Sequence, residues 1–325
     1  MLKYLVLWCT NRCNLNCTYC YAKNNLGNED MEFSIAKKGI DILDNNGTLI
    51  LAGGEPLLNL SLVKQICSYI KDNNRIVKIN IQTNATLIDS SVAKELKKLN
   101  VGVGVSMDGK PKINNICRGS SNKVIQGIQY LREENIKINL NAVITRNNIN
   151  ELCGVVDLAY YLENVNGIGL DLLRSSDLTL RASAESVYEG INRAYERCKQ
   201  LETLTGRKVF IREIEDARQR ISKSYENCHY CYASKGQAAV IIPNGNMYLC
   251  SSLVGIKEYF LGNIGKSFKL KALEDIEFDQ CKECQYYKMC RKVCPSRGIL
   301  NNIDGVISKE ECALRKACFV IAKNS

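Results

Sequence analysis

Three cysteines near the start of the chain, spaced CxxxCxxC, constrain its fold and chemistry more than any other feature. Cys13, Cys17 and Cys20 follow directly on a short apolar run at 3–9. Three thiolates can bind three irons of a cubane cluster, and because a fourth ligand would complete the cluster, one iron stays open to another molecule. Three cysteines and a water could also bind a catalytic zinc ion, although CxxxC is an unusual spacing for zinc. The motif therefore predicts a metal centre with an open position.

Ala52-Gly53-Gly54-Glu55-Pro56 forms a second motif at the end of the apolar run 48–51. Alone, it would predict only a turn between a strand and a helix. Together with the cysteine motif, it resembles the radical S-adenosylmethionine (SAM) superfamily. The resemblance implies that the three cysteines hold a 4Fe-4S cluster and that the amino and carboxylate groups of SAM chelate the open iron. It also implies that the GGEP segment (Gly53, Gly54 and Glu55) hydrogen-bonds the amino group.

The same resemblance assigns further SAM contacts to strand ends. Gln82-Thr83-Asn84 resembles the third-strand segment of the family, whose first residue faces the cofactor, and Ser106-Met107-Asp108-Gly109 resembles the fourth-strand segment, whose serine does so. Tyr19 stands where the family places an aromatic ring against adenine, although such a ring can equally serve packing. Outside GGEP, the expected SAM contacts are Tyr19, Gln82, Asn84, Ser106, Asp108 and Asn141.

The cysteine content indicates the kind of protein. The chain has 325 residues and 17 cysteines, whereas disulfide frameworks belong to short secreted chains. The N-terminal apolar run is too short for a signal peptide, and no run approaches the roughly 18 apolar residues of a membrane span. We therefore expect a cytoplasmic metal-binding protein without a membrane partner. The formal charge is +10 without a long Lys/Arg run, so nucleic acid is not an expected partner.

The first half of the chain alternates predicted strands with amphipathic helices, which indicates a parallel sheet with helices on its outer face. The predicted strands are at 3–9, 48–52, 76–82, 101–106, 136–143 and 167–173. The predicted helices are at 34–45, at 59–72, from a cap at Asp89 to Leu99, and from a cap at Ser120 to Glu134.

Small or polar residues alternate with apolar ones in three of these strands. Lys78, Asn80 and Gln82 alternate with Val77, Ile79 and Ile81, and the pattern recurs at 101–106 and 136–142. Parallel strands buried on both faces are almost continuously apolar, and a closed eight-stranded barrel fills its lumen with bulky branched side chains. We therefore predict an α/β fold with a partial (β/α)6 TIM-like barrel around a polar ligand. A sheet whose polar face meets solvent is the alternative.

A second group of cysteines lies in the C-terminal part of the chain. The order of these residues, with GxxxxC at 245–250 and CxxCxxxxxCxxxC at 281–294, resembles the SPASM extension of radical SAM enzymes. The resemblance implies two auxiliary 4Fe-4S clusters, one held by Cys228, Cys231, Cys250 and Cys294 and the other by Cys281, Cys284, Cys290 and Cys312. Two structural zinc sites are the alternative. Since four cysteines complete a cluster, we expect electron transfer or structural support from this iron-sulfur domain.

We divide the chain into a radical SAM partial barrel at 1–180, a helical connector at 181–227 and a SPASM domain at 228–325. Residues 174–225 are polar and helix-prone and show no active-site motif, so we expect their charges to face solvent. Cys117 follows the fourth strand in a predicted loop at the ligand-facing end, where its thiol could donate a hydrogen atom to a substrate radical. A buried bystander thiol is the alternative. His229, the only histidine, is expected to be a spacer.

The resemblance implies an enzyme that cleaves SAM reductively to a 5′-deoxyadenosyl radical, which abstracts hydrogen from an unactivated carbon. Because enzymes with this extension mostly modify peptides or proteins, we expect maturation of a ribosomally made peptide by a thioether or carbon-carbon cross-link. A flavodoxin or ferredoxin would supply electrons. The short stretch before the cysteine motif leaves no room for an N-terminal leader-binding domain, so a separate leader-binding protein or the barrel itself would recognise a leader.

Four other readings stay open: a peptide epimerase, a sulfatase-maturing type of enzyme, a small-molecule dehydrogenase and an iron-sulfur electron carrier. A sulfatase-maturing enzyme carries an aspartate directly after the GxxxxC cysteine, where this chain has Ser251. The GGEP segment argues against a carrier that does not cleave SAM.

Overall fold

The computed structural model describes residues 2–223, 229–276, 278–290, 293–301 and 308–324. Within these residues, ten strands form one sheet in the order β10-β9-β8-β1-β2-β3-β4-β5-β6-β7. The strands are β1 Leu2–Thr10, β2 Leu43–Gly53, β3 Lys78–Thr83, β4 Gly102–Ser106, β5 Ile138–Ile144, β6 Val165–Leu172, β7 Phe210–Ile211, β8 Ala238–Ile241, β9 Asn246–Tyr248 and β10 Phe260–Asn263.

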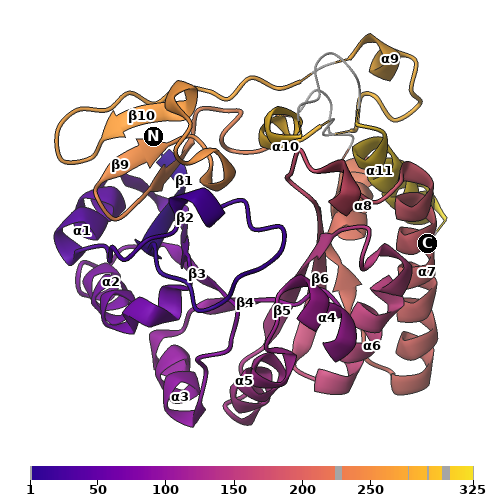
Figure 1. Ribbon diagram of the computed structural model, residues 1–325, viewed down its shortest axis with the longest axis horizontal. Coiled ribbons are helices and arrows are strands. Elements are labelled where there is room, and N and C mark those ends of the chain that lie inside the picture. Colours follow the sequence, from indigo (N-terminus) through magenta and orange to yellow (C-terminus); the bar gives the residue numbers. More distant parts are fainter. Residues whose placement is uncertain (1, 224–228, 277, 291–292, 302–307, 325) are drawn as a thin grey trace.

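Parallel pairing runs without interruption from β1 to β7, and helices cover the outside of the resulting arc (Figure 1). The α-helices are α1 Phe33–Asp41, α2 Leu60–Asp72, α3 Ser90–Leu99, α4 Pro111–Cys117, α5 Ser121–Glu133, α6 Leu152–Leu162, α7 Ala184–Thr205, α8 Arg212–Ser222, α9 Asp279–Lys282, α10 Pro295–Leu300 and α11 Lys309–Lys323. The 3-10 helices are η1 Lys23–Asn25, η2 Pro56–Asn59, η3 Ile149–Glu151, η4 Leu178–Leu180, η5 Ser251–Leu253 and η6 Lys257–Tyr259. This arrangement confirms the predicted α/β class and the open, partial barrel.

The polar lumen is also confirmed. The outer-face residues Val105, Ile138 and Leu140 are buried in the main core under the helices. Their neighbours on the other face, Ser106 and Asn139 among them, line a central cavity instead. The alternating pattern therefore separates a core face from a cavity face, and the polar side chains do not belong to an ordinary solvent-covered sheet.

All six predicted strands are present, but one predicted helix end and one predicted helix cap were wrong. The helix predicted at 34–45 ends at Asp41, because Leu43 already pairs with Leu2 at the start of β2 and is buried there. Ser120 does not cap α5: its φ is 54° and its side chain accepts no cap hydrogen bond. The Oδ1 atom of Asn115 accepts from the Ser121 N–H instead, at 3.0 Å. The cap at Asp89 is confirmed, with its Oδ1 accepting from Val92 N at 2.8 Å.

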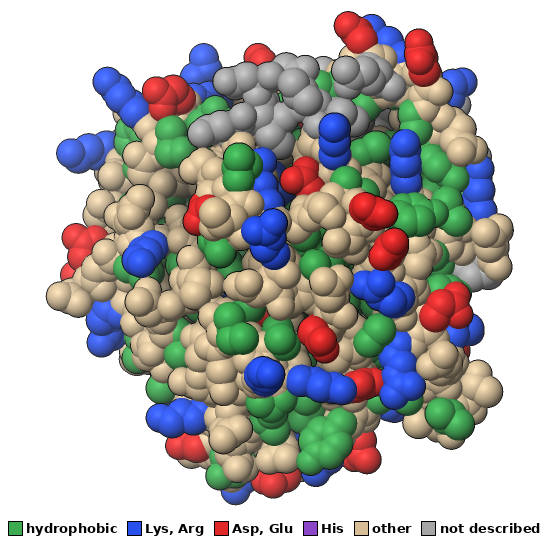
Figure 2. Space-filling model, turned by 45° about the vertical axis from the view of Figure 1, so that its right-hand side comes forward, with side chains coloured by type: hydrophobic (Ala, Val, Ile, Leu, Met, Phe, Trp, Pro, Cys, Tyr) green, Lys and Arg blue, Asp and Glu red, His purple; other side chains and the backbone are tan. Residues whose placement is uncertain are grey.

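The C-terminal part of the chain continues the barrel sheet. Strand β8 pairs with β1 in parallel, β9 pairs with β8 antiparallel, and β10 pairs with β9 antiparallel. Helix α11 packs against α7 and α8. The three domain boundaries given above stay a prediction. No helix in the described ranges has the length and apolar character needed to cross a membrane. On the face drawn in Figure 2, basic and acidic side chains are interspersed.

Candidate functional site

A cavity of about 680 Å³ occupies the inside of the arc and brings together the three N-terminal cysteines and all the predicted SAM contacts except Asp108. Its wall combines the N-terminal cysteine loop, the GGEP segment and the inner faces of the central strands. The predicted site residues that line it are Cys13, Cys17, Tyr19, Cys20, Gly53, Gly54, Glu55, Gln82, Asn84, Ser106 and Asn141. Asp108 and Cys117 are not among the lining residues. That the lining residues bind SAM stays a prediction.

Glu55 fixes the GGEP turn from inside. Its side chain is 1% exposed, and Oε1 accepts hydrogen bonds from Thr83 Oγ1 at 2.6 Å and from Leu57 N at 3.1 Å. Oε2 accepts from Asn84 N at 2.7 Å. Burial raises the pKa of this carboxyl to about 6, although the three hydrogen bonds favour the charged form and lower the pKa. Glu55 therefore ties the end of β2 to the end of β3.

The two glycines of GGEP let the cysteine loop lie directly on the strand ends. A Cβ at Gly54 would collide with the carbonyl of Arg12, and a Cβ at Gly53, whose φ is 130°, would collide with that of Thr10. Backbone N–H groups of Gly54 and Glu55 donate to these same carbonyls at 2.9 and 2.8 Å. A larger residue at either position would push the two predicted motifs apart.

The cysteine loop is held over the cavity by the strand ends and α4. Thr18 N donates to the Cys117 carbonyl at 3.0 Å, and Asn84 Nδ2 donates to Asn14 Oδ1 at 2.9 Å. Burial raises the pKa of the Cys17 thiol to about 11, opposed by the nearby Arg118 guanidinium. Metal binding would deprotonate such a thiol.

The donor set fits an iron-sulfur cluster with one open iron, since three soft thiols and no other strong ligand line the cavity wall at this loop. The side chains are not gathered for it as they stand: within the described ranges, no three His, Cys, Asp or Glu residues converge on one metal position. The fit therefore rests on the residue types and the position of the loop.

Asp108 acts from behind the cavity wall. It is fully buried, accepts a hydrogen bond from the Tyr19 hydroxyl, and pairs with Arg118 through Nε at 2.9 Å and Nη2 at 3.2 Å. The Arg118 guanidinium also lies 5.3 Å from the centroid of the Tyr19 ring. Asp108 thus orients two side chains that do line the cavity. Sequence reasoning missed Arg118, although it directly follows Cys117.

The other predicted SAM contacts form a polar ladder across the inner face of the sheet. Gln82 Nε2 donates to Ser106 Oγ at 3.1 Å, and Asn141 Nδ2 donates to Gln82 Oε1 at 2.8 Å. The ladder ends on Arg212, whose Nη1 donates to Asn141 Oδ1 at 3.2 Å. The expectation that the charges of 174–225 face solvent was therefore wrong for Arg174 and Arg212, which both line the cavity.

Cys117 is the last residue of α4 and is 1% exposed, so the predicted loop position was wrong. Burial raises the pKa of its thiol to about 11. Since the residue does not line the cavity, its position gives no support to a role as hydrogen donor.

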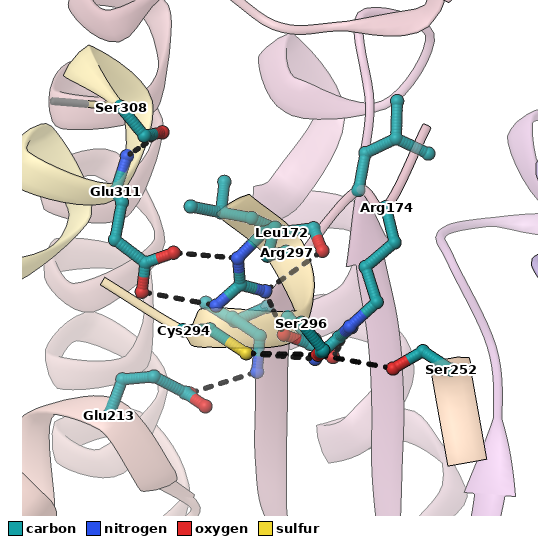
Figure 3. A network of polar contacts seen from close by, with 12 residues as sticks. Leu172, Arg174, Glu213, Ser252, Cys294, Ser296, Arg297, Ser308 and Glu311 are labelled. Atoms are coloured by element: carbon teal, nitrogen blue, oxygen red, sulfur yellow. Dashed lines mark hydrogen bonds and ion pairs between the residues drawn. The ribbon is translucent and has the colours of Figure 1, made fainter. Parts of the chain in front are cut away.

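Two C-terminal cysteines are linked by a chain of hydrogen bonds through two serines, of which Figure 3 shows Cys294, Ser296 and Ser252. Cys250 Sγ lies 3.2 Å from Ser252 Oγ and Cys294 Sγ lies 3.3 Å from Ser296 Oγ, while the two hydroxyls are 3.2 Å apart. Burial raises the pKa of the Cys231 thiol, and the thiols of Cys250 and Cys294 add to this. Cys228 lies outside the described residues.

For Cys294, burial would raise the thiol pKa, but the guanidiniums of Arg297 and Arg174 outweigh it and lower the pKa. The remaining assigned residues, Cys281, Cys284, Cys290 and Cys312, are each partly buried. The pKa of the Cys312 thiol is raised by burial and by the nearby Cys284 thiol. The pairing of these cysteines into two clusters stays a prediction.

Glu55→Gln should weaken SAM binding by about tenfold or more and leave the iron content unchanged. The amide keeps the shape but turns one acceptor oxygen into a donor, which would face an N–H or O–H donor in this buried turn. Equilibrium dialysis of SAM and iron analysis of the same samples measure the two effects. Loss of iron together with SAM affinity would mean that Glu55 supports the cysteine loop as a whole.

Comparison with known proteins agrees with this geometry. The model of the radical SAM superfamily matches residues 9–159. The chain is 36% identical over 284 residues to the uncharacterized protein MJ0907 of Methanocaldococcus jannaschii, covering 83% of this chain and 91% of that protein. It is 25% identical over 342 residues to a cysteine-type anaerobic sulfatase-maturating enzyme of Clostridium novyi, covering 90% of this chain and 87% of that enzyme.

Among solved structures, anSMEcpe with bound AdoMet and the Cp18Cys peptide matches with a TM-score of 0.82, at 21% identity and over 99% of both chains. This likeness shows the shared fold. The family match spans the cysteine loop, GGEP and the strands from the end of β1 to β5, which supply most of the cavity wall. The chain therefore belongs to the radical SAM superfamily of enzymes.

Proposed function

We propose that this radical SAM enzyme carries a SPASM-type domain with two auxiliary 4Fe-4S clusters and matures a ribosomally made peptide by forming a thioether or carbon-carbon cross-link. One observation carries the proposal: the wall of the cavity includes both the loop with Cys13 and Cys20 and, from the C-terminal part of the chain, Ser251, which directly follows Cys250. A substrate in this cavity would therefore contact parts of the chain next to both groups of cysteines.

When bound, the cluster and SAM together supply a 5′-deoxyadenosyl radical that can remove hydrogen from an unactivated carbon. The N-terminal cysteines would hold the cluster, and GGEP, Tyr19 and the polar ladder would hold SAM. The chain itself orients these groups: Asp108 holds Tyr19 and Arg118 in place, and Glu55 holds GGEP against the cysteine loop. The helices and the closed outer face of the sheet keep water from the cavity on that side.

A cross-link removes two hydrogens from the peptide, which leave as one hydrogen atom, one electron and one proton. The second group of cysteines would hold the acceptor for the electron. Cys294 supports this role, because two guanidiniums stabilise its thiolate and Arg174 also lines the cavity. A flavodoxin or ferredoxin would supply the electron that SAM cleavage needs. A leader peptide, if present, would be recognised by a separate protein or by the barrel.

A sulfatase-maturing type of activity is the second candidate, favoured by the similarity to the Clostridium novyi enzyme over most of both chains. That activity needs a base beside the substrate. At the position after Cys250 this chain has Ser251, which lines the cavity. Asp171 also lines the cavity, but its carboxylate is paired with Arg174 and Arg297. Although burial alone would raise the pKa of Asp171, the two guanidiniums hold it well below the usual range, which makes a poor base.

The product distinguishes these activities. A short cysteine-rich peptide encoded beside this gene, made synthetically and incubated anaerobically with reconstituted enzyme, SAM and dithionite, should become lighter by two hydrogens in mass spectrometry. Cys117→Ala should still make this product, because the thiol does not reach the cavity. A product of unchanged mass that carries one solvent deuterium, and that Cys117→Ala abolishes, would instead establish an epimerase.

A further inference from the structure

The charges in the cavity wall are unbalanced toward cations. Among the described residues, four basic side chains line the cavity and two acidic ones: Arg118, Lys137, Arg174 and Arg212 against Glu55 and Asp171. Both acids are already engaged by the protein. Glu55 accepts three hydrogen bonds, and Asp171 pairs through one oxygen with Arg297 and through the other with Arg174, each at 2.5 Å. The cavity therefore offers positive charge to a ligand.

Neighbouring residues on β6 and β7 position Arg212 inside the barrel. Strand β7 pairs with β6, with Gly167 opposite Phe210, and places Arg212 over Gly169. A Cβ at Gly169 would lie 2.6 Å from the Arg212 Cζ atom, so only glycine leaves room for the guanidinium on the sheet. The inner face of β6 is thus shaped to hold this side chain.

Two partners fix the direction of the guanidinium. The buried Glu213 accepts from Nε at 2.9 Å and from Nη2 at 2.7 Å through Oε1, while its Oε2 accepts from Leu170 N at 2.9 Å. Asn141 accepts from Nη1 at 3.2 Å. These bonds occupy three of the five N–H groups of an arginine, and the other two have no partner within the part of the chain described. Because the side chain is 55% exposed and lines the cavity, those donors face a ligand.

The other cavity cations are less suited to grip a ligand. Arg118 is turned to Asp108, with which it forms two hydrogen bonds. The two terminal nitrogens of Arg174 donate hydrogen bonds to Asp171 and to Cys294 Sγ. Lys137 precedes β5 and stands one inner-face position before Asn139 and two before Asn141, away from the strand ends that carry the cysteine loop. Arg118 and Arg174 are also held in place and, within the described residues, also keep unpartnered N–H groups, but their side chains are only 12% and 17% exposed. Arg212, at 55%, is the most accessible of the three arginines.

We propose that Arg212 binds a carboxylate of the peptide substrate, an aspartate or glutamate side chain or the C-terminus, and so selects an acidic peptide. This rests on the proposed peptide-modifying function. A preoriented guanidinium is the side chain best matched to a carboxylate, because its planar donors pair with both oxygens and it stays charged at every working pH. Its bonds to Glu213 and Asn141 reduce the entropy lost when the carboxylate binds.

The test is a double-mutant cycle on binding. Peptides that bind reconstituted wild-type enzyme in the presence of SAM are first selected from a displayed library of short random sequences. The tightest-binding peptide is then synthesised in two forms, one with its acidic group and one with the isosteric amide in its place. Wild-type enzyme should bind the amide peptide about 10- to 100-fold more weakly in fluorescence anisotropy. Arg212→Gln should bind both peptides alike, within about threefold. Arg212→Lys, which keeps the charge, should retain a reduced preference.

Lys137→Gln is the matched control, since it removes a cavity cation away from Arg212; it should keep the full preference. If Arg212→Gln and Lys137→Gln lost the preference for the acidic peptide to the same extent, the assignment to Arg212 would be overturned. The preference would then come from the overall positive charge of the cavity. Selected peptides without an acidic residue would also overturn it while the peptide function stands. Weaker SAM binding by Arg212→Gln without coupling to the peptide would assign Arg212 to the cofactor. Selection of no peptide by the wild type would overturn both proposals.

Discussion

Replacing Cys13, Cys17 and Cys20 together with alanine should abolish formation of 5′-deoxyadenosine and lower the iron content of the reconstituted protein from about twelve atoms per chain to about eight. The three thiols line the cavity from one loop, and the described residues supply no other cysteine to its wall. Without them, no cysteine in the described cavity wall would hold the cluster whose open iron makes SAM reducible. Iron analysis and chromatography of the SAM products measure the two losses.

The matched control replaces three cysteines outside both groups, Cys67, Cys153 and Cys198, which do not line the cavity. This variant should keep about twelve irons and full SAM cleavage. If the Cys13, Cys17 and Cys20 variant still cleaved SAM at the wild-type rate, the active cluster would have to lie elsewhere. A wild-type iron content near four would show that the C-terminal cysteines hold no clusters.

Arg297→Met should lower the free energy of unfolding by about 3–5 kcal/mol, the largest effect we expect on stability. Arg297 is 2% exposed and joins the C-terminal segment to the barrel. It pairs with Glu311 through Nε at 2.6 Å and with Asp171 through Nη1 at 2.5 Å, and it donates to the Leu172 carbonyl at 3.0 Å (Figure 3). Methionine fills similar space but leaves the Glu311 carboxylate buried, with Arg315 as its remaining charged partner.

The midpoint of anaerobic urea unfolding, followed by circular dichroism, measures this loss. Arg132→Met is the control, because Arg132 forms an ion pair with Glu163 in which both side chains are exposed, and pairs of that kind contribute about 0–1 kcal/mol. An equal shift for both variants would mean that the buried network does not couple the C-terminal segment to β6. Arg297→Met should also weaken iron binding at Cys294, whose neighbouring cation it removes.

The fold was largely predictable because one local signal, the alternation of apolar and polar residues, agreed with the tertiary structure. In the third to fifth strands, the apolar residues of the alternating pattern face the core and the small or polar residues face the cavity. This assignment of faces does not depend on which strands are neighbours in the sheet. The end of the first helix was missed because residues 43–45 are drawn into β2 by pairing with β1, which helix propensity cannot show.

The candidate site was predictable where a motif is continuous in sequence. The N-terminal cysteine motif and GGEP can each be recognised from the spacing of their residues, and both line the same cavity. Arg212 and Arg174 were missed, because their roles depend on β7 pairing with β6 and on a contact with Cys294 across 120 residues. The pair Gly167 and Gly169 was the only local sign, since glycines in a strand indicate a close approach by another group.

The most direct test of radical SAM chemistry in this cavity is to incubate the reconstituted wild-type protein anaerobically with SAM and dithionite and to quantify 5′-deoxyadenosine and methionine by mass spectrometry. We predict that both form in equal amounts and only when the reductant is present. Iron-replete, reduced protein that leaves SAM intact would contradict the function proposed here.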